Sequence, residues 1–198
     1  MGESLTPDVA IRYACAFAAE LPVGLVVVTR DGRATGPMLA AAISSGLAAS
    51  GRCVLDAGVA ATPTTGVLVR AHRAVGGIQI SASHNPPQYN GLKLFSDAGR
   101  VIPADRGQRV LDAYRNSSPR WVSHDQVGGS KALADTLSDH WALIEKTVAV
   151  DRIRACRFRV LLDANHGSGS LLGRHLLEQL GCSATILGGT PDGQFAHP

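Results

Sequence analysis

The amino-acid sequence predicts an α/β fold: a three-layer sandwich with a largely parallel mixed sheet, followed by the start of a second α/β domain. Short apolar β segments alternate with helical periodicity three times within about the first 80 of the 198 residues, which is typical of βαβ units with parallel pairing. The same pattern starts again near residue 158, beyond a polar, glycine-bearing break at residues 126–130. We therefore expect two domains, residues 1–130 and residues 131–198.

The first helix is expected to begin at Pro7 and to end before Pro22. Thr6 can cap it, Pro7 suits the first helical position, and Asp8 lies at the positive end of the helix dipole. Apolar side chains then recur at helical spacing, so that one face of the helix is buried; they are Ala10, Tyr13, Ala14, Phe17 and Leu21.

Strands and helices alternate from here to residue 81. Residues 25–28 are wholly apolar, as in a strand that is buried on both faces. A polar turn at 29–36 leads to an alanine-rich helix, a short strand, a third helix and a third strand, with predicted ranges 37–49, 53–55, 62–73 and 77–81. Because ligands of such folds bind at the carboxyl ends of the strands, the loops 29–36 and 82–91 are the expected site.

The remaining elements are a strand, a helix, a connecting helix and a second α/β unit. We expect strands at 91–95, 158–162 and 184–187, helices at 103–114 and 171–180, and a long amphipathic connecting helix at 131–147. One βαβ unit cannot cover both faces of its own sheet. The sequence is therefore expected to be incomplete, with an uncovered strand edge and an exposed apolar face.

Composition excludes several classes of function. The net charge of +3 comes from scattered cations, and only 5% of the residues are aromatic, which argues against nucleic-acid binding. No apolar run approaches the roughly 20 residues of a membrane span, and no signal-peptide pattern opens the chain, so we expect a cytoplasmic protein without a membrane partner. The four cysteines form no C-x-x-C pair and lie in apolar runs; we expect reduced core thiols.

The richest chemistry lies between residues 77 and 95. An apolar strand leads into a cluster of Ser, His, Asn and Pro, and an Asn-Gly pair then turns the chain. This pattern exposes Ser83 at a strand end, with His84 beside it and Lys93 ten residues further on. Lysine can bind a phosphate or move a proton, whereas serine needs an activating partner to act as a nucleophile. An ordinary polar turn is the alternative interpretation of these residues.

Five sequence motifs resemble, in order, those of the α-D-phosphohexomutases, the family of phosphoglucomutase, phosphomannomutase and phosphoglucosamine mutase. The most specific is the active-site serine loop, matched by Ser-Ala-Ser-His-Asn-Pro at 81–86 and Asn-Gly-Leu-Lys at 90–93. The others are Arg-Asp-Gly-Arg-Ala-Thr-Gly at 30–36, Gly-Val-Ala-Ala-Thr-Pro-Thr at 58–64, Asp-Ala-Asn-His-Gly-Ser-Gly at 163–169 and Pro-Asp-Gly-Gln-Phe at 191–195. The resemblance covers nearly the whole chain and implies the N-terminal part of such an enzyme.

The resemblance implies a phosphoserine mechanism. The serine that matches Ser83 is phosphorylated in active members of the family and passes its phosphoryl group to the 1- or 6-hydroxyl of a hexose monophosphate. The bisphosphate intermediate reorients and returns its other phosphoryl group, and a hexose bisphosphate serves as activator. A Mg²⁺ ion bound at Ser83 neutralises the developing charge.

The resemblance also implies roles for four other residues. Lys93 is expected to shuttle protons or to contact phosphate during catalysis. His84 is expected to act beside the serine and to line the sugar site. Asn85 and Arg33 are expected to bind the substrate or to shape the loop.

The sequence lacks several features of the family. The Asp-Gly-Asp-x-Asp-Arg loop that supplies most Mg²⁺ ligands is absent, as are the ligand-binding loops of the third and fourth domains and an arginine before Leu5. We therefore expect the chain to bind metal weakly and to lack turnover alone, with the other Mg²⁺ ligands outside it. Ser81 and the Lys-Leu-Phe-Ser run at 93–96 are mildly similar to phosphoglucosamine mutase, which leaves the preferred hexose open.

Three alternatives to an active mutase segment use the same residues. A non-catalytic remnant that binds sugar phosphates or a partner protein would have the same Ser83 loop. A serine hydrolase would need a base and an acid near the serine, and no Gly-x-Ser-x-Gly elbow surrounds Ser83. Dinucleotide binding would need G-x-G-x-x-G, but the spacing here is that of Gly167, Gly169 and Gly173.

Overall fold

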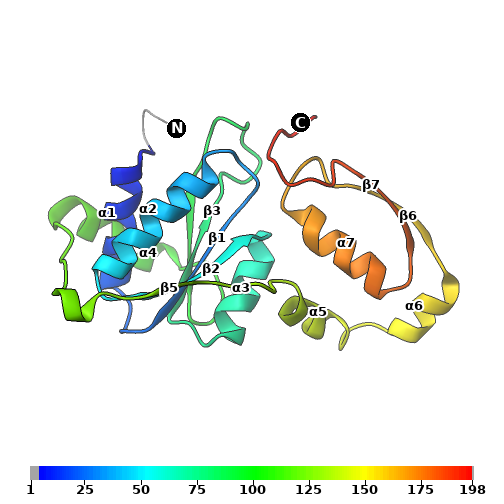
Figure 1. The fold of residues 1–198 in the computed structure, drawn as a ribbon, viewed down its shortest axis with the longest axis horizontal. Coiled ribbons are helices and arrows are strands. Elements are labelled where there is room, and N and C mark those ends of the chain that lie inside the picture. Colours follow the sequence, from blue (N-terminus) through cyan, green and yellow to red (C-terminus); the bar gives the residue numbers. More distant parts are fainter. Residues whose placement is uncertain (1–4, 198) are drawn as a thin grey trace.

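The computed structural model describes residues 5–197, which form a larger unit on a five-stranded sheet and a smaller unit on a two-stranded sheet (Figure 1). None of the helices in this range has the length and apolar character needed to cross a membrane. The helices are α1 (Pro7–Ala19), α2 (Gly36–Ala49), α3 (Thr62–Ala71), α4 (Ala104–Asn116), the 3-10 helix η1 (His124–Gln126), α5 (Ser138–Ile144), α6 (Val150–Cys156) and α7 (Gly169–Gln179). The strands are β1 (Leu25–Arg30), β2 (Cys53–Val59), β3 (Gly76–Ile80), β4 (Leu92–Ser96), β5 (Ser130–Ala132), β6 (Arg159–Asp163) and β7 (Ser183–Leu187).

The larger sheet has the strand order β4-β3-β1-β2-β5. Its pairs are parallel except for β3 and β4, which are antiparallel, so the predicted largely parallel mixed sheet is confirmed. The central strand is β1, where Val27 pairs with Leu55 of β2 on one side and Gly77 of β3 on the other. Because sheet and helices enclose β1, Val26 and Val28 have no exposed surface, as the apolar run predicts.

Helices cover both faces of this sheet, which confirms the three-layer sandwich (Figure 1). On one face, Phe17 of α1, Leu39 of α2 and Val110 of α4 belong to a single apolar cluster with side chains of the strands. On the other face, Leu68 of α3 packs in a second cluster with Val27. The strands β1 and β2 therefore contribute to both cores, and the carboxyl ends of the central strands carry polar loops.

The connection between the two units differs from the sequence prediction. The prediction of one long helix over residues 131–147 is wrong. Ser130–Ala132 instead form β5, which pairs in parallel with β2 and extends the first sheet. Two short helices follow, α5 and α6, and the second of them has no counterpart in the prediction.

Local hydrogen bonds explain why a single helix does not form here. The N–H of Leu133 donates to the carbonyl oxygen of Asp56 (2.8 Å), so the chain continues along β2 after β5. Asp135 then accepts the N–H groups of Leu137 and Ser138 at 2.9 and 3.0 Å and thereby starts α5. Hydrogen bonds from Ser138, above all from its hydroxyl, lower the pKa of Asp135 to about 2.

The four cysteines are free thiols, but they are not all in the core. Cys15 is buried in α1 and Cys182 is half-buried. Cys53 and Cys156 are exposed, so the prediction of core positions is wrong for these two. Both lie at the ends of elements, at the first residue of β2 and the last residue of α6, where an apolar neighbourhood in sequence does not imply burial.

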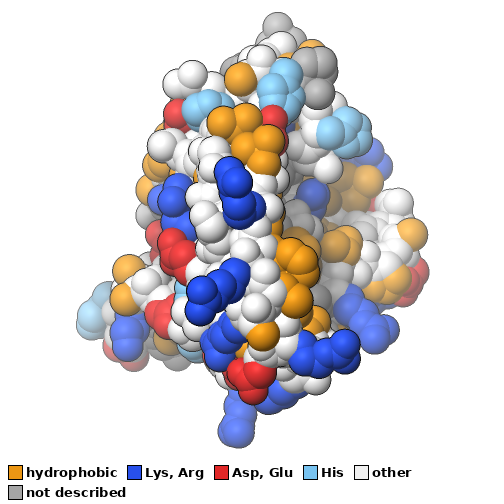
Figure 2. Space-filling view, turned by 90° about the vertical axis from the view of Figure 1, so that its right-hand side faces the viewer, with side chains coloured by type: hydrophobic (Ala, Val, Ile, Leu, Met, Phe, Trp, Pro, Cys, Tyr) orange, Lys and Arg blue, Asp and Glu red, His pale blue; other side chains and the backbone are white. Residues whose placement is uncertain are grey.

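The second unit presents apolar side chains to solvent. Its strands β6 and β7 pair in parallel, and α7 follows β6. Leu161, Leu187 and Phe158 are 65%, 49% and 50% exposed, in keeping with the expected uncovered apolar face. Figure 2 looks onto this side of the molecule and shows apolar side chains in a strip between lysine and arginine side chains.

The helix α5 contacts α3 through two histidines. His140 Nδ1 lies 3.0 Å from Thr64 Oγ1, and His72 Nε2 lies 3.3 Å from Asp139 Oδ2. Burial, with a smaller contribution from Arg70, lowers the pKa of His140 below its usual value of 6.5. The folded chain therefore favours the neutral imidazole at this contact.

Lowering the pH from about 7.5 to about 5.5 is expected to destabilise the fold through His140. Because the pKa of His140 is lower in the folded chain, the unfolded chain takes up this proton first, and the free energy of unfolding falls as the pH drops below about 6.5. Urea unfolding at both pH values should show a smaller loss for His140→Gln than for wild type. The exposed His124 serves as control through His124→Gln, and equal losses in wild type and His140→Gln would contradict the expectation.

Candidate functional site

The carboxyl ends of three central strands meet at one edge of the larger sheet. The N–H of Asp31 after β1 donates to the carbonyl oxygen of Ile80 in β3, and the N–H of Ala60 after β2 donates to that of Arg30, both at 2.9 Å. These bonds fix the loops that follow β1, β2 and β3 beside one another. This is where parallel sheets bind ligands, and the two loops expected from sequence, 29–36 and 82–91, both lie here.

The backbone of Ser83 has an unusual conformation. Its φ angle is +58°, in the left-handed region, which costs a residue with a Cβ about 1–2 kcal/mol. The N–H of Ser83 donates to Ser81 Oγ at 3.1 Å, and the N–H of Asn85 donates to the carbonyl oxygen of Ala82 at 3.1 Å. This tight turn lifts the exposed Ser83 side chain off the end of β3.

Arg33 lies under the serine loop rather than at the surface. Its residue is 1% exposed, and its Nη1 forms an ion pair with the Asp31 carboxylate. Its Nη2 donates to the main-chain oxygen of Ser83 at 3.3 Å and also to that of Asn85. The guanidinium thus satisfies two loop carbonyls and one buried carboxylate, and so fixes the Ser83 turn to the loop after β1.

The second unit contributes an aromatic ring to the same cluster. The ring of Phe195 lies 4.8 Å from the guanidinium carbon of Arg33, a distance at which a cation and a π face attract each other. Two glycines allow this approach: a Cβ added to Gly32 would lie 2.2 Å from the carbonyl oxygen of Pro191, and one added to Gly193 would lie 2.8 Å from Arg33 Cα. The motifs at 30–36 and 191–195 therefore meet in space.

Lys93 reaches the serine loop because β4 runs back along β3. In this antiparallel pair Lys93 lies opposite Gln79, near the end of β3 that leads to Ser83. Its Nζ lies 3.3 Å from Thr62 Oγ1 at the start of α3. Ser83, Lys93 and Thr62 line one cavity of about 360 Å³, which Gly167 of the second unit also borders.

Ser83 also lines a second and larger cavity, of about 520 Å³, between the two units. His84 and Asn85 border it from the first unit, and Asn165 and His197 border it from the second. The structure therefore brings His84, Asn85 and Ser83 to one cavity and Lys93 and Ser83 to another, whereas the guanidinium of Arg33 is buried beneath the loop that separates them.

Hydrogen bonds hold the far wall of the larger cavity. Asn165 Nδ2 donates to the main-chain oxygen of His197 at 2.6 Å, and the N–H of His197 donates back to Asn165 Oδ1 at 3.2 Å. Asp163 accepts the N–H of Asn165, which lowers the pKa of Asp163. Sequence reasoning did not assign Asn165, His197 or Phe195 to the site, although the motifs at 163–169 and 191–195 contain two of them.

The described residues do not form a Mg²⁺ site by themselves. Residues 5–197 contain no group of three or more His, Cys, Asp and Glu side chains placed to hold a metal ion. Among the described residues that line the two Ser83 cavities, Asp31 is the one carboxylate, and Arg33 already pairs with it. Mg²⁺ binds through several oxygen ligands, typically carboxylates, water and phosphate, so Ser83 and Asp31 do not suffice.

Comparison with known proteins agrees with this arrangement of loops. Residues 1–120 match the family model described as phosphoglucomutase/phosphomannomutase, alpha/beta/alpha domain I. The chain belongs to this family. A phosphoglucomutase/phosphomannomutase of Thermococcus kodakarensis is 34% identical over 200 residues, and a phosphoglucosamine mutase of Synechococcus sp. is 33% identical over 191 residues. These alignments cover 98% and 96% of the chain but only 43% and 41% of the relatives.

A solved structure shows the same relation in three dimensions. The crystal structure of a phosphoglucomutase/phosphomannomutase family protein from Burkholderia thailandensis matches with a TM-score of 0.75 at 28% identity. The match covers 100% of this chain and 43% of that protein. The fold of this phosphoglucomutase/phosphomannomutase family member thus agrees with that of its relatives, and the chain spans less than half of their length.

Proposed function

We propose that this chain carries the phosphoryl-transfer serine of an α-D-phosphohexomutase, which interconverts hexose 1-phosphates and hexose 6-phosphates. The observation that supports this most is the position of Ser83: it is exposed, has a left-handed backbone conformation and borders both cavities. The relatives named as mutases of hexose and hexosamine phosphates support the class of substrate.

In the proposed cycle, Ser83 carries a phosphoryl group on Oγ. A sugar hydroxyl attacks the phosphorus, the new bond to the sugar oxygen forms as the bond to Oγ breaks, and the hydroxyl proton ends on Oγ. The hexose bisphosphate then returns its other phosphoryl group to Ser83 by the reverse exchange. The product is the isomeric monophosphate, and the phosphorylated serine is regenerated.

Lys93 is the proposed source of positive charge for this transfer. It lines the smaller cavity together with Ser83, where an ammonium group stabilises the charge on the oxygens of the transferred phosphoryl group. The ammonium group can also donate a proton to the leaving Oγ, and the amine that results takes up the proton of the attacking hydroxyl, so that Lys93 ends in the form in which it began. Thr62, whose hydroxyl lies 3.3 Å from Lys93 Nζ, positions it.

His84, Asn85 and Arg33 have different proposed tasks. His84 and Asn85 border the larger cavity, where their polar groups would bind sugar hydroxyls and orient the hexose. Arg33 acts as a positioning residue, because its Nη2 donates to the carbonyl oxygens of Ser83 and Asn85 from below the loop. A direct contact of Arg33 with the substrate would require the loop to move.

A non-catalytic sugar-phosphate-binding segment is the second candidate function. The observation in its favour is that Asp31 is the one carboxylate among the described residues that line the two Ser83 cavities, and that it is paired with Arg33. Such a segment would bind hexose phosphates in the same cavities without exchanging phosphoryl groups. It would have the same fold as a mutase segment, so an assay of phosphoryl exchange is needed to distinguish the two.

Mutase turnover tests the proposal and identifies the hexose. The purified chain is assayed with glucose, mannose and glucosamine 1-phosphates, Mg²⁺ and a hexose bisphosphate, beside Ser83→Ala and the remote exposed Ser45→Ala. Turnover that Ser83→Ala abolishes and Ser45→Ala preserves would support a complete catalytic unit. A folded chain without turnover would support the expected incomplete unit, whereas turnover that survives Ser83→Ala would contradict the assigned serine.

A further inference from the structure

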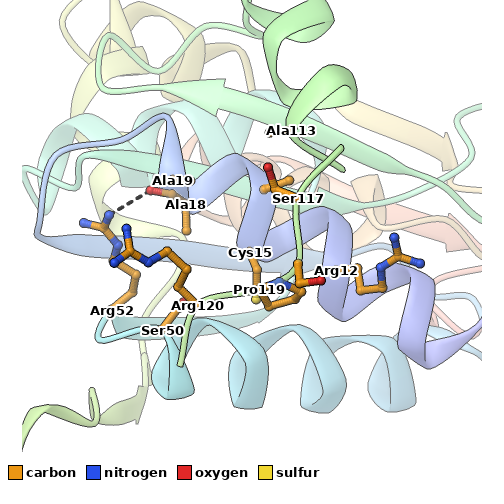
Figure 3. Close-up of a pocket in the computed structure, with 12 residues that line it drawn as sticks. Arg12, Cys15, Ala18, Ala19, Ser50, Arg52, Ala113, Ser117, Pro119 and Arg120 are labelled. Carbon is orange, nitrogen blue, oxygen red and sulfur yellow. Dashed lines mark hydrogen bonds between the residues drawn. The ribbon is translucent and has the colours of Figure 1, made fainter. Parts of the chain in front are cut away.

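A cavity of about 370 Å³ lies away from the serine loop, on the helical face of the first unit (Figure 3). It is bordered by α1, by the residues after the C-terminal end of α2, and by the segment 117–120 that follows α4. Its floor is apolar, with Ala16, Ala19 and the thiol-bearing Cys15. None of its lining residues borders the two Ser83 cavities.

Arginines give this cavity its charge. Arg12, Arg52 and Arg120 line it, and no aspartate or glutamate among residues 5–197 does so. The C-terminal ends of α1, α2 and α4 also lie here and bring a partial charge of about −0.5 each. The three guanidinium groups therefore exceed the helix ends by a charge of roughly +1.5.

Within residues 5–197, the hydrogen bonds that hold Arg52 all go to main-chain carbonyl groups. Its Nη2 donates to the carbonyl oxygens of Ala18 and Leu21 at 2.8 and 3.0 Å, and its Nη1 donates to that of Pro22. These bonds leave the Nε–H and one Nη1–H of Arg52 free. Partial burial lowers the pKa of Arg52, because the charge is removed from water without a carboxylate beside it.

Arg120 completes one end of the cavity. Figure 3 draws its guanidinium on the same side of the cavity as that of Arg52, and both residues line the cavity. The structure gives Arg120 no hydrogen bond or ion pair within residues 5–197, so all five of its N–H donors are available. Two guanidinium groups that line one cavity can bind the same anion, and together they offer the paired donors that a phosphate group binds.

Arg12 and a serine border the rest of the cavity. The guanidinium of Arg12 donates to the carbonyl oxygen of Tyr114 at 3.2 Å and lies 4.8 Å from the centre of its ring. Ser117, which follows α4, also lines the cavity. The cavity thus has one strongly cationic end, an apolar floor and a polar rim, which is the composition of a small-molecule site.

We propose that this cavity binds a small organic phosphate, with its phosphate group between Arg52 and Arg120 and its carbon skeleton over the alanines of α1. This site is separate from the proposed sugar site at Ser83, and its occupant is a second ligand of the chain. Because the site lies where α1, α2 and α4 meet, a bound phosphate would tie these helix ends together and raise the stability of the first unit.

Phosphate titrations followed by amide NMR test the proposal. The probes are inorganic phosphate and phenyl phosphate, and the protein is the Ser83→Ala chain, so that phosphoryl transfer to Ser83 plays no part. Both probes are expected to shift the amides of Arg52, Ser117 and Arg120. Tighter binding of phenyl phosphate assigns the cavity to a phosphate ester, and equal binding assigns it to inorganic phosphate.

Two variants of equal charge change make the result decisive. Arg120→Met should weaken binding at this cavity at least about tenfold, because it removes the unpaired guanidinium. Arg100→Met removes an exposed arginine elsewhere on the surface and should leave the affinity unchanged. Shifts confined to the Ser83 loop, equal affinities in the two variants, or no shifts at all would overturn the proposal, and none of these results bears on the role of Ser83.

Discussion

Arg33→Ala is expected to lower the free energy of unfolding by about 3–5 kcal/mol. The substitution leaves the carboxylate of Asp31, which is 5% exposed, buried without its partner. It also removes the donors to the carbonyl oxygens of Ser83 and Asn85 and the contact with the ring of Phe195. Urea unfolding of wild type and variant measures the loss, and limited proteolysis should show earlier cleavage in the loop at 82–91.

A partly exposed ion pair between the neighbouring strands β1 and β2 provides the control. Arg30 Nη1 lies 3.6 Å from Asp56 Oδ1, with both side chains reached by solvent, so Arg30→Ala should cost less than about 1 kcal/mol. The double variant Asp31→Asn, Arg33→Met should recover part of the stability lost in Arg33→Ala, because it leaves no unpaired buried charge. Similar decreases in the free energy of unfolding for Arg30→Ala and Arg33→Ala would contradict the role of Arg33 in fixing the Ser83 loop.

Ser83→Gly is expected to abolish phosphoryl exchange without lowering stability. Glycine adopts a φ of +58° without the steric cost that serine bears there, and this gain offsets the larger entropy that glycine loses on folding. Ser83→Ala lacks the hydroxyl but bears the same backbone cost, so its free energy of unfolding should stay within about 0.5 kcal/mol of wild type.

Both variants are compared by urea unfolding and by incorporation of phosphate from a hexose bisphosphate. The expected order of stability is Ser83→Gly at or above wild type, with Ser83→Ala close to wild type. Ser83→Gly less stable than Ser83→Ala by more than about 1 kcal/mol would show that the left-handed backbone is not the resting state of this loop. Phosphate incorporation that persists in both would place the acceptor elsewhere.

The central strands could be predicted because burial on both faces dictates their composition. The apolar run at 25–28 lies within β1. The alternation of apolar strands with helices in the sequence correctly predicted the three-layer sandwich. β5 could not be predicted in this way, because all three of its residues are exposed at the edge of the sheet and therefore carry no apolar pattern. The prediction of one connecting helix was wrong because the hydrogen bonds that Asp135 accepts at the start of α5 depend on a polar side chain. Such bonds produce no apolar periodicity in the sequence.

The candidate site, too, was predicted in part. The motif around Ser83 located the serine and, through the antiparallel return of the chain, Lys93. Sequence did not show that Arg33 is buried under the loop, since a guanidinium near a serine loop suggests substrate binding as readily as support. Nor could it show that Arg52 and Arg120 line one cavity, because the approach of distant residues depends on how α1, α2 and α4 pack.

The most direct test of the phosphoserine proposal is the position of the phosphate group after transfer. The chain is incubated with a hexose 1,6-bisphosphate, digested and analysed by peptide mass spectrometry, with Ser83→Ala and Ser45→Ala in parallel. We predict phosphate on the peptide that contains Ser83 in wild type and Ser45→Ala, none in Ser83→Ala, and release of hexose monophosphate in equal amount. Phosphate on another residue, while Ser83 of the folded chain stays unmodified, would contradict the assignment of Ser83 as the phosphoryl carrier.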